Sequence, residues 1–146
     1  MEHLGYRPAA DEDAAYLFYL EEVGMRRPAE ALWGRWIPSA TIETYDVADH
    51  WIIEVEGRPV GCLAMTSEPG TIFIRRLYIA PDRRGRGIGT AVLREVALWA
   101  ESATSSIRLS VLSTNPAARR LYEREGFVPE TMTADRIHLI LRPRAE

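Results

Sequence analysis

The residues best suited to chemistry in this chain lie in one short segment rich in glycine and arginine. Gly85, Gly87 and Gly89 stand where an apolar segment ends. An amphipathic helix is expected to begin there, near Ile88. Each glycine costs about 0.5–1 kcal/mol relative to alanine, so three together indicate a role other than stability. Unpaired N–H groups at a helix start attract anions, and the arginines within residues 83–86 add positive charge. The segment therefore predicts a phosphate-binding loop.

Two common nucleotide-binding loops do not match this segment. The Walker A loop ends in Gly-Lys-Ser/Thr, and the chain contains no lysine. The dinucleotide fingerprint is Gly-x-Gly-x-x-Gly after the first strand of a strand–helix–strand unit. Here the third glycine comes one residue too early, and the segment lies in the middle of the chain. A Rossmann-type nucleotide-binding protein is therefore disfavoured, and it ranks third behind the two functions named at the end of this section.

Two motifs resemble those of the GCN5-related N-acetyltransferase (GNAT) family. Residues 84–89, Arg-x-x-Gly-x-Gly, are similar to the family's Arg/Gln-x-x-Gly-x-Gly/Ala loop, which binds the pyrophosphate of acetyl-CoA. Residues 115–127 are similar to its second signature, Asn-x-x-Ala-x-x-Leu/Phe-Tyr-x-x-x-Gly-Phe. The resemblance extends from residue 6 to about 142 and includes residues 77–81. Residues 25–36 also resemble a group of small prokaryotic acetyltransferases, a narrower match that brings no substrate.

The resemblance implies how acetyl-CoA is held. In the family, backbone N–H groups of the loop and of the helix start bind the pyrophosphate. The fourth strand pairs with the pantetheine arm like an added strand, and one of its N–H groups helps to stabilise the oxyanion. Asn115 has two compatible interpretations, as the N-cap of its helix and as a contact to the arm. The implied cofactor-binding positions are Leu77, Tyr78, Ile79, Arg84, Gly85, Arg86, Gly87, Ile88, Gly89, Thr90, Asn115 and Ala118.

The resemblance also makes Tyr122 the candidate general acid. A phenol with a pKa of about 10 stays protonated beside a thiol with a pKa of about 8.5, so it can donate as the thiolate leaves. The alternative is that Tyr122 only continues the apolar stripe of Ala118 and Leu121 along its helix. The match to the second signature favours the catalytic or thiol-orienting role.

The strand expected over residues 71–79 departs from the family pattern. Many members place a Glu in or beside this strand to act on the ammonium through water, whereas Tyr78 stands there in this chain. Glu30, Glu54 and Glu68 are the candidates elsewhere, each with a solvated surface position as the alternative. A chain of waters, or an amine that arrives already neutral, would also suffice.

The acceptor is expected to bind beside the N-terminal helical region. Glu30, Trp33 and Trp36 lie in the part of the chain that lines the acceptor pocket in related folds. If Glu30 faces this pocket, it would attract a cationic amine. Core packing is the alternative for at least one of the two tryptophans.

Apolar spacing and turn residues place these motifs on a series of strands and helices. The first half begins with a strand over residues 3–7 and a helix from the N-cap Asp11 to Val23, which Arg26-Arg-Pro28 stops. A second helix from about 29 and strands over 51–56, 59–66 and 71–79 follow. The second half has a helix from 88, a strand over 107–112, a helix from 115 with Gly126 as its C′ residue, and strands over 127–129 and 136–141. This order is that of the GNAT family. The resemblance implies a three-layer α/β (α+β) acyl-CoA N-acyltransferase fold. Its central sheet is mixed and mostly antiparallel, with six to seven strands flanked by about four helices.

The strand over residues 71–79 is apolar on both faces, which is typical of a central strand covered on both sides. Strict alternation defines the two faces as Ile72, Ile74 and Tyr78 on one, and Phe73, Leu77 and Ile79 on the other. The resemblance adds a bulge near Leu77. It also implies a separation from the strand over residues 107–112 that admits the pantetheine arm.

The composition fits one soluble domain over residues 1–146, with 47% hydrophobic and 27% charged residues. The net charge of −3 argues against a nucleic-acid partner. No apolar run approaches the ~18 residues of a membrane span, and no signal-peptide core is found. No membrane partner and a cytoplasmic location are therefore expected. Cys62, the only cysteine, lies in an apolar strand pattern that favours a buried inert thiol. His3, His50 and His138 lack ligand spacing, so no metal site is expected.

Together these observations predict an acyl-CoA-dependent N-acyltransferase that uses acetyl-CoA and an amine acceptor, either a small molecule or a protein. A different acyl donor or an O-acceptor is the runner-up among enzymes. The alternative from another class is a CoA-binding sensor or interaction module with weak catalysis, which the missing strand carboxylate favours. A homodimer is compatible with the resemblance, because dimers are common in the family.

Overall fold

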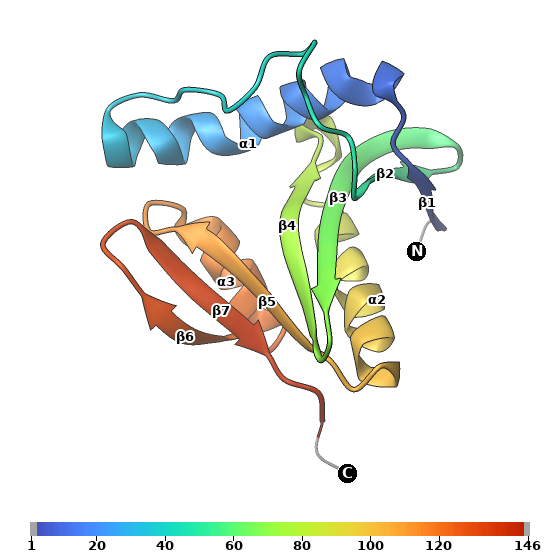
Figure 1. Ribbon diagram of the computed structural model, residues 1–146, viewed down its shortest axis with the longest axis vertical. Coiled ribbons are helices and arrows are strands. Elements are labelled where there is room, and N and C mark those ends of the chain that lie inside the picture. The colour runs from blue at the N-terminus through green and yellow to red at the C-terminus, as the bar shows by residue number, and fades with distance from the viewer. Residues whose placement is uncertain (1–2, 145–146) are drawn as a thin grey trace.

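The computed structural model describes residues 3–144, which form one seven-stranded sheet with helices on both faces (Figure 1). The strand order is β1-β2-β3-β4-β5-β7-β6, and each neighbouring pair is antiparallel except β4 and β5, which are parallel. The elements are β1 (Leu4–Pro8), α1 (Ala14–Trp33), β2 (His50–Val55), β3 (Arg58–Glu68), β4 (Thr71–Ile79), α2 (Ile88–Ser102), β5 (Ser106–Leu112), α3 (Pro116–Arg124), β6 (Val128–Met132) and β7 (Arg136–Leu141). The predicted mixed, mostly antiparallel sheet is confirmed.

Two buried clusters on opposite faces of the sheet define its three layers. Successive residues of one strand point to opposite faces, and here Ile52 packs with α1 whereas Ile53 packs with α2 and α3. The cluster under α1 is the smaller and contains Leu17 and Leu20, both fully buried. Figure 1 shows α1 crossing one end of the sheet and α2 lying along the other face.

Helix α1 is one continuous helix of 20 residues, so the predicted break at 26–28 and the second helix from 29 are wrong. The described part of the chain accordingly has three α-helices rather than about four. Pro28 lies inside α1, where the lost hydrogen bond and the ring clash cost about 3 kcal/mol. Burial of Leu17 and Leu20 before it and of Ala29 after it on the same helix outweighs this local preference.

The bulge in β4 changes which side chains face α1. Ala64 of β3 pairs with Arg76 and Met65 pairs with Ile74, so Arg75 is the extra residue in β4. The bulge therefore lies at Arg75, two residues before the position near Leu77 that the resemblance implied.

Beyond the bulge, every side chain of β4 is moved to the opposite face. Leu77 and Ile79 consequently join Ile72 and Ile74 in the cluster under α2, while Tyr78 packs in the cluster under α1. The predicted grouping of Tyr78 with Ile72 and Ile74 is wrong for this reason.

Strands β4 and β5 separate after a short parallel pairing. Their pairs are Thr71 with Ser106, Ile72 with Ile107 and Phe73 with Arg108, and no pair follows. In Figure 1 the two strands are close at their first residues and diverge toward α1. The expected separation between these strands is confirmed.

The C-terminal elements follow the sequence signals closely. Helix α2 begins at Ile88, and the side chain of Asn115 caps α3 by accepting a hydrogen bond from the Ala118 N–H (3.3 Å). Phe127 is a buried core residue rather than the start of a strand, and β6 extends instead over Val128–Met132. Within residues 3–144, none of the helices combines the length and the apolar character needed to cross a membrane.

Candidate active site

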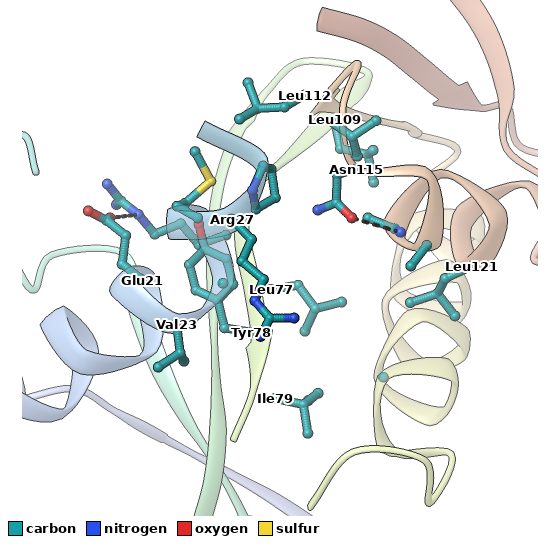
Figure 2. Close-up of a pocket in the computed structure, with 18 of the residues that line it drawn as sticks. Glu21, Val23, Arg27, Leu77, Tyr78, Ile79, Leu109, Leu112, Asn115 and Leu121 are labelled. Atoms are coloured by element: carbon teal, nitrogen blue, oxygen red, sulfur yellow. Dashed lines mark hydrogen bonds and ion pairs between the residues drawn. The ribbon is translucent and has the colours of Figure 1, made fainter. Parts of the chain in front are cut away.

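A cleft of about 1650 Å³ lies where β4 and β5 separate. Figure 2 shows its two walls: Leu77, Tyr78 and Ile79 of β4 with α1 on one side, and Asn115 and Leu121 on the other. The walls also include the start of α2 and the end of β5. Most of the predicted site residues line this one cleft: Trp33, Leu77, Tyr78, Ile79, Arg84, Gly85, Gly87, Ile88, Gly89, Thr90, Asn115, Ala118 and Tyr122.

The glycine loop presents backbone donors to one end of the cleft. Gly85 and Gly87 have φ values of 77° and 78°, which side-chain-bearing residues rarely adopt, and a Cβ on either would meet no atom within 4 Å. The first helical hydrogen bond of α2 runs from the Ala91 N–H to the Gly87 carbonyl (3.0 Å). The N–H groups of residues 88–90 therefore have no partner within the helix and can bind an anion.

Two arginines place positive charge at the same end. Arg83 and Arg84 both line the cleft, and Arg84 Nε donates to the Ile79 carbonyl (3.1 Å), which ties the loop to the end of β4. Arg86 is exposed and is not among the lining residues, although it was predicted as a cofactor-binding position. It lies between Gly85 and Gly87, the two glycines with positive φ.

The edge of β4 that faces the cleft is free of a strand partner. After Phe73, no residue of β4 pairs with β5, so Leu77, Tyr78 and Ile79 pair only with β3. Backbone polar groups need a partner when they are buried. An extended ligand segment along this edge would supply one.

Tyr122 lies in the wall formed by α3 and is 8% exposed. Its ring packs edge-on against Phe127 at 5.7 Å between centroids, so it also belongs to the core cluster, as the alternative interpretation expected. Burial raises the pKa of Tyr122 to about 12. No hydrogen bond contributes to this shift, and the phenol stays protonated at neutral pH beside the cleft.

None of the three carboxylates predicted as base candidates lines the cleft. Glu30 is exposed, Glu54 forms an ion pair with Arg7 (3.1 Å), and Glu68 is exposed at the end of β3. Helical spacing allowed Glu30 to face the pocket, but the continuous α1 turns that position outward.

Glu21 is a cleft residue that sequence reasoning missed. It is 7% exposed, and among the described residues it is the single carboxylate that lines the cleft. Its Oε1 atom lies 2.7 Å from Arg76 Nε and accepts a hydrogen bond from the Tyr45 hydroxyl (3.2 Å). A signal was present, because Glu21 follows Leu17 by one helical turn on the apolar stripe of α1.

A buried polar network continues from this carboxylate. Arg76 Nη1 lies 3.2 Å from His50 Nε2, and His50 Nδ1 lies 2.8 Å from the Ala48 carbonyl. The bulge at Arg75 places Arg76 on this face of the sheet. Cys62 is buried nearby, and burial raises its pKa to about 12, consistent with the predicted inert thiol.

Helix α1 packs closely against β4 where Gly24 faces the ring of Tyr78. A Cβ on Gly24 of α1 would lie 2.6 Å from Cδ1 of the Tyr78 ring. The absence of a side chain at Gly24 thus lets α1 approach β4, and burial raises the pKa of the Tyr78 phenol. Tyr78 therefore serves as a packing surface for α1 as well as a part of the cleft.

Comparisons with known proteins agree with this arrangement. The sequence model of the acetyltransferase (GNAT) domain matches residues 46–129, more than half of the chain. An uncharacterised N-acetyltransferase of Methanocaldococcus jannaschii is 28% identical over 118 residues, which cover 75% of this chain and 52% of that protein. The chain spans about half the length of the curated relatives it matches.

Solved structures share the fold over nearly the whole chain. An acetyltransferase from Thermus thermophilus has a TM-score of 0.74 at 22% identity, covering 97% of this chain and 99% of that one. A diaminobutyrate acetyltransferase from Paenibacillus lautus, solved with L-2,4-diaminobutyric acid and coenzyme A, has a TM-score of 0.67 at 19% identity, covering 98% and 96%. The family match, the diverging strands and the glycine loop at the start of α2 lead to one conclusion: the chain belongs to the GNAT acetyltransferase family.

Proposed function

We propose that this protein transfers an acetyl group from acetyl-CoA directly to a primary amine. The observation that carries the proposal is that one cleft contains an anion-binding helix start, an unpaired strand edge and a protonated phenol. The diaminobutyrate acetyltransferase, whose fold is similar to that of this chain, was solved with coenzyme A and an amine bound. That likeness supports the same class of reaction here.

The donor would lie along the cleft from α2 to α3. The N–H groups of residues 88–90 bind the pyrophosphate, with Arg83 and Arg84 supplying positive charge. The pantetheine arm pairs with the free edge of β4 at Leu77–Ile79 as an added strand. Asn115 lies on the opposite wall, where its side-chain amide can contact the arm.

The chemistry follows from a thioester held on this edge. The amine nitrogen attacks the thioester carbonyl, and a backbone N–H of β4 stabilises the oxyanion. As the carbon–sulfur bond breaks, the amine loses one proton and the departing thiolate gains one. Tyr122 supplies the thiolate's proton, because its raised pKa keeps the phenol protonated at neutral pH. Tyr122 then regains a proton from solvent.

We assign the acceptance of the amine's proton to Glu21, acting through water. It is the carboxylate that lines the cleft, and its position on α1 replaces the strand Glu that β4 lacks. The ion pair with Arg76 fixes the orientation of the carboxylate. The absence of a Glu from β4 also favours a second function, that of a CoA-binding sensor without turnover.

Two measurements test the proposal. Calorimetry with acetyl-CoA, CoA and NAD is expected to show binding of the CoA compounds alone, and a preference for NAD would reject the cofactor assignment. Release of free thiol from acetyl-CoA is then followed with a panel of primary amines. Release that depends on the amine supports the enzyme, whereas CoA binding without such release supports the sensor.

A further inference from the structure

At the end of the cleft beside α1 lie three arginines whose guanidinium groups have no partner within the described residues 3–144. Arg27 in α1, Arg35 just after α1 and Arg136 at the start of β7 all line the cleft. None of their three guanidinium groups forms an ion pair or a hydrogen bond within residues 3–144, and Arg136 bonds the Thr133 hydroxyl through its backbone alone. In contrast, Arg76 and Arg108 are held by carboxylates. The guanidinium groups at this end are therefore free to bind an anion.

Two hydrogen bonds bring these arginines to the same end of the cleft. Thr114 Oγ1 donates to the Pro28 carbonyl (2.6 Å), and Trp33 Nε1 donates to Asp135 Oδ2 (3.4 Å). Pro28 and Asp135 are each adjacent in sequence to one of the three arginines, and Trp33 is two residues from the third. The end of α1 is thereby joined to the loops that follow β5 and precede β7.

The same two bonds limit the size of what can enter. They connect the end of α1 to the loops that follow β5 and precede β7, and so narrow the access of a folded protein surface to the cleft. A small molecule fits the space that remains within the cleft. We therefore favour a small acceptor over a protein acceptor.

The charge of the lining selects among small amines. Figure 2 shows Arg27 extending from α1 toward Leu77 and Tyr78, where the thioester is expected. A guanidinium binds a carboxylate or phosphate with two parallel hydrogen bonds. A polycationic amine is repelled there, and the positive surroundings favour the neutral form of the amine that must attack. This reverses the expectation that Glu30 attracts a cationic acceptor.

We infer that the acceptor is a small primary amine that also carries an anionic group, a carboxylate or a phosphate, held by Arg27 with Arg35 and Arg136. This inference rests on the proposed acetyl transfer. It adds the substrate class, and it makes Arg27 a specificity-determining residue of the acceptor site.

The test compares amines in matched pairs that differ in one anionic group. β-Alanine is compared with ethylamine, and O-phosphoethanolamine with ethanolamine. Putrescine is added as a cationic amine, and a tetrapeptide with an acidic N-terminal residue is added to represent a protein acceptor. The anion-bearing member of a pair is expected to have a kcat/KM at least about tenfold higher, since a charged hydrogen-bonded contact has about that effect. The two pairs distinguish a carboxylate from a phosphate.

Variants then locate the selectivity. Arg27→Gln should lower the ratio of anion-bearing to neutral substrate by about tenfold, and Arg27→Glu should invert it toward putrescine. Arg58→Gln removes the same charge at the exposed first residue of β3, outside the cleft, and should leave the ratio unchanged. Thermal unfolding of each variant checks that the fold is kept.

The outcomes separate this inference from the proposed function. A preference for neutral amines, putrescine or the peptide, or a ratio insensitive to Arg27, overturns the inference while acetyl transfer stands. If no amine is acetylated, the proposed function fails. Calorimetry of the same pairs on the CoA-bound protein then decides whether the cleft selects anions, and equal affinity within each pair rejects that too.

Discussion

Arg76 Nε of the bulged strand β4 lies 2.7 Å from Oε1 of Glu21 in helix α1. The Glu21 side chain is 9% exposed and that of Arg76 is 29% exposed, so most of the contact is shielded from water. Such a pair offsets its own desolvation only while both partners are present. The bulge at Arg75 is what brings Arg76 to this face, so one irregularity in the sheet creates the ion pair.

Replacement of Glu21 by Gln tests its assigned role. We expect the free energy of unfolding to fall by about 1–3 kcal/mol, because Arg76 is left partly buried without its counter-charge. We also expect turnover to fall more for an ε-amine with a pKa of about 10.4 than for a dipeptide α-amine with a pKa of about 8, which needs less help to lose its proton. Steady-state rates with an α-blocked lysine and with glycylglycine measure the difference. Equal losses on both substrates would make Glu21 purely structural.

Replacement of Tyr122 by Phe keeps the ring that packs on Phe127 and removes the hydroxyl. We expect kcat to fall by about 10² or more, while the dissociation constant of acetyl-CoA changes little. Stopped-assay rates and calorimetry provide the two numbers. An unchanged kcat would assign the residue to the core alone.

The contact between Gly24 and Tyr78 predicts a non-additive pair. Gly24→Ala places a Cβ 2.6 Å from the Tyr78 ring and should destabilise the protein by about 1–3 kcal/mol. In a Tyr78→Ala background the clash is absent, and alanine is favoured over glycine in a helix by about 1 kcal/mol. Urea unfolding of the two single variants and the double variant gives the coupling energy. Additive effects would show that α1 does not need this close approach.

The loop before α2 needs glycine at position 87, because the backbone there has the left-handed conformation. Gly87→Ala forces a side chain into φ of 78° at the start of α2, which costs about 1–2 kcal/mol. If the loop shifts to relieve that strain, the N–H groups of residues 88–90 move and acetyl-CoA binds about tenfold more weakly. Calorimetry measures the affinity. Gly70→Ala, also at positive φ but in the β3–β4 turn, is the matched control and should leave affinity unchanged.

Burial of the Cys62 thiol predicts how stability depends on pH. Its pKa is raised to about 12 in the folded protein, so the native state keeps its proton at pH values where the unfolded state loses it. Stability from this group is complete below about pH 9 and is lost as pH rises toward 12, with a slope of up to about 1.4 kcal/mol per pH unit. Urea unfolding between pH 8 and pH 10 should show a steeper loss for wild type than for Cys62→Ala. Parallel pH profiles would contradict this account.

Local signals in the sequence predicted where most residues of the proposed donor half lie, at one end of the cleft. The glycine loop, the N-cap Asn115 and the position of Tyr122 on α3 depend on residues close together in the chain, so local spacing and the two family motifs predict where they lie. The diverging β4 and β5 were accessible only through the family resemblance.

The acceptor half depends on packing between distant residues. Pro28 was expected to end a helix, but α1 continues past it with Ala29 buried, and Glu30 lies at the surface. The bulge at Arg75 reversed the faces of β4, which strict alternation could not show. Glu21 was overlooked because its partner Arg76 is brought to it by that bulge.

Formation of an N-acetylated amine together with free CoA tests the central claim most directly. Purified protein is incubated with acetyl-CoA and β-alanine, and the acetylated product and the thiol are quantified together. We predict equimolar product and thiol at a rate that Tyr122→Phe lowers by about 10². Tight binding of acetyl-CoA with no product above the uncatalysed rate, for β-alanine and for every other amine of the panel, would contradict the account.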